Sequence, residues 1–238
     1  MRILRISGRW KRWGSCWRTV AFRGSAVDTR KLVRSIRDFG TRRGMITGIG
    51  TPAAEAVRRI EETPVPRDAV RRRSCTKKWY SRTSNPRFHV VVIDCGLKLN
   101  IIRMLNRNHC NVTVVPFDTP AEEILALAPD GILISNGPGD PTDVPEVIRT
   151  LAELRGRVPM FGICLGHQLL ALSCGAKTYK LKFGHRGGNH PVKELATGKI
   201  AITSQNHSYA VEEDSAAPSV EASQFPLAVL DSSPLLCA

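Results

Sequence analysis

The sequence of 238 residues contains no run that approaches the roughly 20 apolar residues of a membrane-spanning helix. With 42% hydrophobic and 24% charged residues, it has enough apolar side chains for a sizeable core, which excludes wholesale disorder. Its seven cysteines form an odd set without a Cys-x-x-Cys pair, so neither a metal ribbon nor a small disulfide scaffold is expected. We therefore expect a globular protein of a reducing cytoplasm, without a membrane partner.

Acidic residues are scarce only in the first part of the chain. Residues 1–87 hold 23 Lys and Arg against 6 Asp and Glu, whereas residues 88–238 hold 12 against 15. The net charge of +14 therefore describes two unlike segments, and steering by charge could involve only the first. The basic first part with its four tryptophans could suggest nucleic-acid binding, but the sequence contains no RNA- or DNA-binding motif. Nucleic acid is therefore not an expected partner.

Residues 1–26 form an unmatched basic segment, which we assign to no domain. Residues 1–27 contain no acid, and an Arg-rich start with a few serines is also typical of an organelle transit peptide. Sequence foreign to the domain, from a displaced start or a frameshift, is a further interpretation. The sequence leaves these alternatives open, and a cytoplasmic location is our main expectation.

Two helices are predicted before the main domain. Residues 27–50 have the pattern of an amphipathic helix followed by a short strand, with Asp28 as a plausible cap. Residues 51–61 can form a second helix with its apolar side chains on one side. Prolines and clustered arginines then indicate that 51–86 is a basic, Pro-containing linker.

From residue 87 onward the chain alternates between apolar strands and amphipathic helices. The predicted strands cover 88–94, 111–116, 131–135 and 159–163, and the predicted helices cover 99–107, 121–127, 144–154 and 166–173. This alternation is typical of an α/β fold with a doubly wound, mostly parallel sheet. Past Phe183, short strands such as 199–203 predict an antiparallel extension at the sheet edge.

The segment Gly162-Ile163-Cys164-Leu165-Gly166 places a cysteine between two glycines at a strand-to-helix turn. A nucleophile on such a tight turn needs small neighbours two residues away on each side, because larger side chains would clash. The start of the helix should favour the thiolate, and the amide of Leu165 is placed to donate to an oxyanion. We therefore predict Cys164 as a nucleophile.

A second glycine-rich segment, Asn136 to Pro141 (NGPGDP), follows the preceding strand and so lies at the same carboxyl edge of the sheet. Two glycines and two prolines make a rigid loop whose backbone can approach a substrate closely. The phosphate-binding pattern GxxxxGK[ST] is absent, so this loop is not predicted to bind ATP.

These two segments together resemble the class I, triad-type glutamine amidotransferases. Further stretches resemble the small, glutaminase subunit of carbamoyl phosphate synthetase, namely FHVVVIDCGLKLNIIRML, FGICLGHQLLAL, KFGHRGGNHPV and ITSQNHSYAV. The resemblance implies a flavodoxin-like fold, with a remnant of the small-subunit N-terminal domain at 27–50, the amidotransferase domain at 87–215 and a divergent tail at 216–238.

The resemblance also implies a reaction. Cys164 would attack the carboxamide carbon of glutamine, release ammonia and leave a glutamyl thioester that water hydrolyses. The amides of Leu165 and Gly139 would form the oxyanion hole. The implied glutamine site consists of Gly137, Gly139, Leu165, Gln168, Asn206, Ser208 and Tyr209.

The last two of these positions usually hold Gly and Phe in the family, so Ser208 and Tyr209 are departures. The change from Phe to Tyr is expected to be mild, whereas Ser for Gly matters if that backbone needs a positive φ.

The resemblance implies a protein partner as well as glutamine. Ammonia would pass to a large synthetase subunit that uses bicarbonate and ATP, for arginine or pyrimidine synthesis. ATP and Mg²⁺ are expected on that subunit, and neither a cofactor nor a metal is expected in this chain.

A cysteine nucleophile needs a base, and the base needs an orienting partner. In the family that this chain resembles, both come from a downstream His-Pro-Glu segment, which this sequence does not contain. His207 is the candidate substitute, His167 should point away from the thiol, and structural roles are expected for both. The alternative function is therefore that of a catalytically impaired relic or regulatory protein that binds glutamine.

Overall fold

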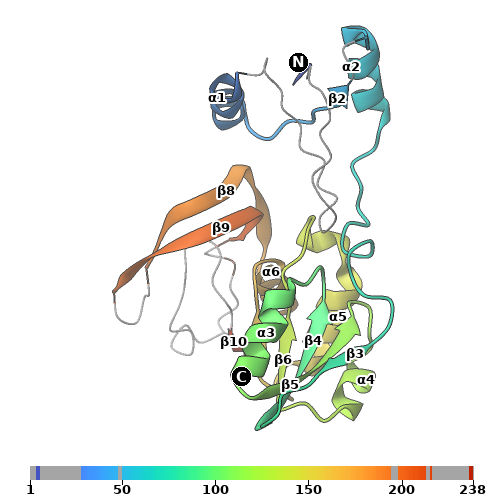
Figure 1. Ribbon diagram of the computed structural model, residues 1–238, viewed down its shortest axis with the longest axis vertical. Helices are drawn as coiled ribbons and strands as arrows, with labels where there is room; N and C mark the ends of the chain where they lie inside the picture. The colour runs from blue at the N-terminus through green and yellow to red at the C-terminus, as the bar shows by residue number, and fades with distance from the viewer. Residues whose placement is uncertain are drawn as a thin grey trace. The chain divides into compact units, whose positions relative to one another are not determined.

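The computed structural model describes residues 4–5, 28–47, 50–193, 198–212, 215 and 236–237. The chain divides into two compact units, residues 1–66 and 67–238 (Figure 1). The predicted basic segment and the predicted tail lie outside the described residues, apart from Leu4–Arg5 and Leu236–Cys237. None of the described helices is long and apolar enough to cross a membrane.

The first unit contains the two predicted helices. They are α1 (Thr29–Phe39) and α2 (Ala53–Glu62), and the short strand between them, β2 (Ile46–Thr47), pairs in parallel with β1 (Leu4–Arg5). The side chain of Asp28 accepts a hydrogen bond from the amide of Lys31 at 2.9 Å, which confirms the predicted cap. Helix α2 buries Ala56 and Ile60 on its predicted apolar side.

The second unit is built on a six-stranded sheet with the order β10-β7-β6-β4-β5-β3. The strands are β3 (Trp79–Ser81), β4 (Phe88–Asp94), β5 (Cys110–Pro116), β6 (Gly131–Ile134), β7 (Met160–Gly162) and β10 (Leu236–Cys237). The four inner strands are parallel and the two outer strands antiparallel. The parallel strands follow the flavodoxin-like order 2-1-3-4, which confirms the predicted fold class.

Helices cover both faces of this sheet (Figure 1). They are α3 (Leu99–Arg107), α4 (Ala121–Ala126), the 3-10 helix η1 (Pro141–Asp143), α5 (Pro145–Leu154) and α6 (Leu165–Ser173). Within β4, Val91 and Ile93 join the core that includes α5 and α6, whereas Val92 packs on the side of α3. Successive residues of a strand point to opposite faces, so a strand buried on both faces has a continuous apolar run.

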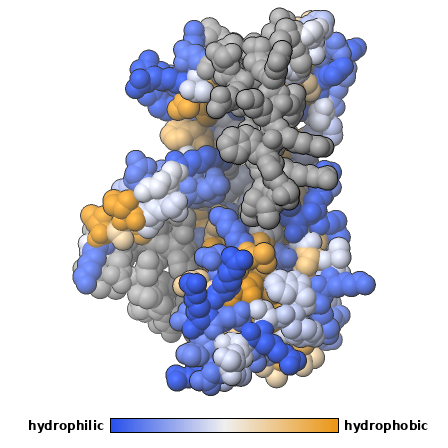
Figure 2. All heavy atoms as spheres, viewed as in Figure 1, coloured by the Kyte–Doolittle hydropathy of each residue, from blue (hydrophilic) through white to orange (hydrophobic). Residues whose placement is uncertain are grey.

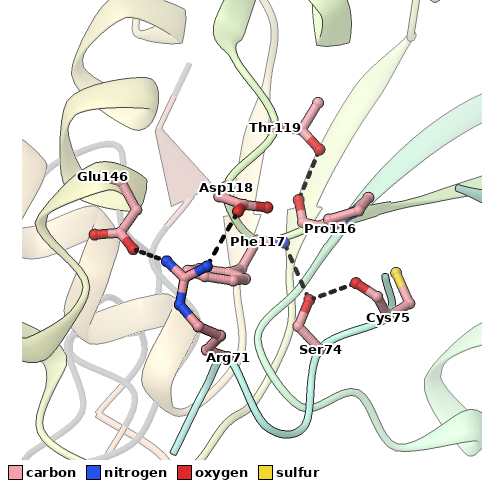
Figure 3. Close-up of polar contacts among 8 residues, drawn as sticks. All are labelled: Arg71, Ser74, Cys75, Pro116, Phe117, Asp118, Thr119 and Glu146. Atoms are coloured by element: carbon pink, nitrogen blue, oxygen red, sulfur yellow. Dashed lines mark hydrogen bonds and ion pairs between the residues drawn. The ribbon is translucent and has the colours of Figure 1, made fainter. Parts of the chain in front are cut away.

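The structure differs from the predicted linker 51–86 over its second half. Residues 67–86 belong to the second unit, Val70 is buried in its core, and β3 pairs with β5. Figure 3 shows how Arg71 reaches Asp118 and Glu146, at 3.6 and 3.4 Å. The basic composition predicts a linker here, whereas in the structure Arg71 pairs with two acidic residues of the domain.

The predicted antiparallel extension of the main sheet is also incorrect. Strands β8 (Thr178–Lys193) and β9 (Ile200–Val211) pair with each other in a separate two-stranded sheet, the β8–β9 ribbon. The described edges of the main sheet belong to β3 and β10 instead. Hydrophobic side chains gather at the outer end of the ribbon (Figure 2), where Ile200 and Ile202 are exposed.

Candidate active site

The predicted nucleophile lies on a sharp turn between β7 and α6. Cys164 has φ +54° and ψ −106°, a conformation that residues other than glycine rarely adopt. A Cβ on Gly162 would lie 2.5 Å from the backbone of Gly166, and a Cβ on Gly166 would overlap the carbonyl oxygen of Ile134. Both glycines are therefore required by close packing, as the sequence pattern predicted.

The environment of the thiol differs from the prediction. Burial raises the pKa of Cys164 above its ordinary value, although a hydrogen bond from the amide of Leu165 and the charge of Lys98 act in the opposite direction. The start of α6 thus does favour the thiolate locally, but desolvation outweighs it. The motif alone predicts a net preference for the thiolate, and the structure corrects this.

Alkylation of Cys164 by iodoacetamide should therefore accelerate with pH, by about tenfold per unit from pH 7 to pH 9, because only the thiolate reacts. The variant Lys98→Met removes a charge that lowers the pKa of Cys164 and should slow alkylation at pH 8, whereas Lys77→Met, an exposed lysine outside the cavity, should not. Peptide mass spectrometry of timed samples gives the rates. A plateau below pH 8 would contradict this expectation.

A cavity of about 910 Å³ opens at the carboxyl edge of the parallel strands, within the size range of small-molecule sites. Its walls come from the turn after β7, the loop 136–141 after β6, the turn after β4, and strand β9. All the predicted site residues line this one cavity, namely Gly137, Gly139, Cys164, Leu165, Gln168, Asn206, Ser208 and Tyr209. Their individual roles in binding and catalysis remain predictions.

The two glycines of the loop 136–141 are needed for different reasons. A Cβ on Gly137 would overlap the carbonyl oxygen of Cys95 and approach Leu165 to 2.5 Å. Gly139 instead adopts φ +98°, in the left-handed region that favours glycine. Gly137 therefore lets the loop pack closely against Cys95 and against Leu165, a residue of the cavity wall.

The turn after β4 is organised by a buried carboxylate that the sequence pattern did not single out. Asp94 accepts hydrogen bonds from the amides of Cys75 at 2.9 Å, Gly96 at 2.9 Å and Leu97 at 2.8 Å. Asn136 joins this turn to the loop after β6, because it donates to the carbonyl of Gly96 at 3.0 Å. The loops after β4 and β6 are thereby held together.

Three cations at the cavity were not predicted from the sequence. Arg73, Lys98 and Arg186 line it, and no Asp or Glu is among the described residues that do. Lys98 could have been found, because it follows a parallel strand at its carboxyl end. Arg73 and Arg186 come from the supposed linker and from β8, whose positions depend on long-range packing. The cavity thus favours ligands that carry an anionic group.

Neither candidate histidine is arranged as an evident base. His207 lines the cavity, but its Nδ1 lies 2.9 Å from the carbonyl oxygen of Tyr209 and its Nε2 3.4 Å from Oε1 of Gln205. His167 lies outside the cavity lining, and burial, followed by the electrostatic effect of His207, lowers its pKa to about 4. The Nδ1 atom of His167 is buried and has no hydrogen-bond partner among the described residues, and the structural role expected for each histidine stays a prediction.

Ser208 causes no backbone strain. Among the described residues, the non-glycine residues with positive φ are His109, Ala128 and Cys164. The hydroxyl of Ser208 instead accepts a hydrogen bond from Arg186 at 2.6 Å. The departure from glycine therefore places a contact at the cavity wall and does not distort the chain.

Curated relatives share about half of the sequence in the matched region. The carbamoyl phosphate synthase small chain of Bacillus caldolyticus is 53% identical over 191 residues, and that of Bacillus cereus (strain ATCC 10987 / NRS 248) is 56% identical over the same length. Each alignment covers 80% of this chain and 52% of the relative. The chain thus spans about half the length of the curated relatives it matches.

Solved structures include a glutamine amidotransferase from Methylobacillus flagellatus, with 19% identity, a TM-score of 0.41 and coverage of 54% of this chain and 58% of that one. A glutamine amidotransferase from Thermotoga maritima has 18% identity, a TM-score of 0.42 and coverage of 52% and 62%. The family model described as "Glutamine amidotransferase class-I" matches residues 91–227. That match extends over more than half of the sequence, and the chain belongs to the class-I glutamine amidotransferase family.

Proposed function

We propose that this chain is the glutamine-hydrolysing part of a carbamoyl phosphate synthase small chain. The observation that carries the proposal is the cavity in which every residue of the predicted glutamine site meets the cysteine of the strand-to-helix turn. The curated relatives at 53% and 56% identity, which are named carbamoyl phosphate synthase small chains, support the same assignment.

The proposed reaction has two steps. Sγ of Cys164 bonds to the carboxamide carbon of glutamine, the C–N bond breaks, and the amide nitrogen leaves as ammonia with the proton of the thiol. Water then attacks the glutamyl thioester, which yields glutamate and restores the thiol. The amides of Leu165 and Gly139 stabilise the negative oxygen that develops in both steps.

The charge of the cavity supports a substrate that carries a carboxylate. The cations Arg73, Lys98 and Arg186 attract the α-carboxylate of glutamine, which is the anionic group of that molecule. Arg186 is held in place by Ser208 and by the carbonyl of Phe183, at 3.0 Å. A fixed guanidinium loses little freedom when it binds a carboxylate.

The proposal includes a partner. Ammonia released at Cys164 would be consumed by a large synthetase chain that binds ATP and Mg²⁺ and uses bicarbonate, in arginine or pyrimidine synthesis. The cytoplasm is the proposed compartment for both chains.

A second candidate function is glutamine binding without turnover. It is favoured by the raised pKa of Cys164 and by the lack of a His-Pro-Glu segment in the sequence. Without a base the rate would fall by orders of magnitude, although binding and the oxyanion-stabilising amides could support residual activity.

The deciding experiment is mass spectrometry after incubation with the diazo-ketone analogue of glutamine. The thiol proton passes to the diazo carbon of this analogue, sulfur bonds to that carbon, and nitrogen gas leaves. We expect one adduct per chain, on Cys164, and protection by L-glutamine but not by D-glutamine. Calorimetry with L-glutamine measures binding separately. Binding without an adduct would support the second candidate, and a folded chain with neither property would contradict both.

A further inference from the structure

We propose that Asn136 is a positioning residue whose side-chain amide holds the loop 136–141 to the turn after β4, residues 95–98, so that the amide of Gly139 keeps the direction that oxyanion stabilisation requires. The inference rests on the proposed function and deepens it. Asn136 lines the cavity, yet both polar atoms of its side chain have partners in that turn. Its task is therefore to fix the loop.

The side chain of Asn136 both donates and accepts. Its Nδ2 donates to the carbonyl oxygen of Gly96 at 3.0 Å, and its Oδ1 accepts from the amide of Lys98 at 3.2 Å. A carbonyl oxygen can only accept and a backbone N–H can only donate, so these two partners fix the orientation of the side-chain amide. The two bonds together determine both the distance and the direction of the loop relative to the turn.

The main chain of Asn136 is held through the residue before it. Ser135 is completely buried, and its hydroxyl accepts from the amide of Cys95 at 2.9 Å and donates to the carbonyl oxygen of Asn136 at 2.8 Å. A buried hydroxyl without partners would cost free energy, and this one is used as donor and as acceptor. Asn136 is thus restrained at its side chain and at its carbonyl.

Close packing prevents the loop from moving toward the turn. A Cβ on Gly96 would lie 2.9 Å from Cδ of Pro138 and 3.3 Å from Cα of Gly137. The turn itself is fixed by the amides that donate to Asp94. The bonds of Asn136 restrain movement in the opposite direction, so the loop keeps one position relative to the turn.

Gly139 has few restraints of its own. Its φ of +98° is in the region that favours glycine, and among the described residues a Cβ there would meet only Ala69, at 3.5 Å. On its far side, the carboxylate of Asp140 accepts from the amide of Thr142 at 2.9 Å, which fixes the end of the loop. The direction of the Gly139 amide therefore depends on the two ends of the loop, and Asn136 fixes the first of them.

Hydrogen exchange of the full chain, without ligand, tests the restraint. The amide of Cys95 reports separation of the loop from the turn, because its acceptor Ser135 comes directly before the loop and neither residue is changed in the variant Asn136→Ala. We expect this variant to raise the exchange rate of the Cys95 amide about tenfold relative to amides of β4, which report global unfolding. Asn85→Ala, at an exposed asparagine outside the cavity lining, is the matched control. An unchanged ratio in Asn136→Ala would overturn the proposal.

Two ligands separate positioning from simple binding. With the nitrile analogue of glutamine, Sγ of Cys164 bonds to the nitrile carbon and the thiol proton passes to the nitrogen, which gives a thioimidate without a leaving group. Its nitrogen takes the place of the negative oxygen. By calorimetry, we expect Asn136→Ala to weaken the nitrile about tenfold and L-glutamine by less than about twofold. Ser135→Ala, which removes one hydroxyl, should act in the same direction and replaces Asn136→Ala if that variant does not fold.

The outcomes distinguish this inference from the proposed function. Equal effects on both ligands, or none, would overturn the inference alone. A wild-type chain that binds glutamine but forms no thioimidate would also overturn it, because the amide of Gly139 would then stabilise no adduct. A wild-type chain that binds neither ligand would contradict the proposed function and the inference with it.

Discussion

Replacing Cys164 by serine should abolish labelling by the diazo-ketone analogue, with a fall in rate of at least about a thousandfold at pH 8. The reason is that a serine hydroxyl stays protonated and needs an adjacent base, whereas a thiol supplies some thiolate by itself. Among the described residues, His207 is the histidine that lines the cavity, and its two ring nitrogens face oxygen atoms of Tyr209 and Gln205. Intact-mass measurements over time give the rate.

The matched control for this experiment is Cys75→Ser. Cys75 is a partly exposed thiol whose pKa is raised to about 11, chiefly by burial, and it lies outside the cavity lining. This variant should be labelled as fast as the wild-type chain. Glutamine affinity should stay within about threefold in Cys164→Ser, because the side chains are similar in size. Continued labelling of Cys164→Ser would place the nucleophile at another cysteine.

Replacing Gly166 by valine should cost about 4 kcal/mol or more of the free energy of unfolding, in the range of the most damaging single substitutions. A Cβ at this position would overlap the carbonyl oxygen of Ile134 and come within 2.9 Å of its Cβ. Strand β6 cannot retreat, because it is hydrogen-bonded between β4 and β7 and buried in the core. Since a domain is stable by only about 5–15 kcal/mol, the variant should be largely unfolded or close to it.

Urea unfolding followed by circular dichroism measures this loss. The control is Gly188→Val on the β8–β9 ribbon, where a Cβ would meet no atom within 4 Å and the backbone φ is not positive. It should change stability by less than about 1 kcal/mol. An unfolding midpoint of Gly166→Val equal to that of the wild-type chain would show that α6 does not pack against β6 so closely.

The parallel core of the fold could be predicted because its signals are local. Strand β4 and helix α3 begin and end at the predicted residues, since an uninterrupted apolar run and a helical period specify each of them. The turn at Cys164 could also be predicted from the sequence. The backbone packs so closely there that two glycines are needed within five residues.

The features that sequence patterns missed depend on partners that are distant in the sequence. Trp79 lies in a strand because it pairs with Val114 of β5, more than 30 residues later in the sequence. No local sequence pattern predicts that pairing. Arg186 enters the cavity through the pairing of β8 with β9.

The division of the cavity between the main sheet and the β8–β9 ribbon has a consequence for heat inactivation. A two-stranded sheet is only marginally stable by itself, whereas the six-stranded sheet is covered on both faces. The ribbon, with Tyr209, should therefore detach at a lower free energy than global unfolding requires. On warming, the site should therefore be lost at a lower temperature than the fold of the main sheet. A ligand that contacts both the ribbon and the main sheet should bring these two temperatures closer together.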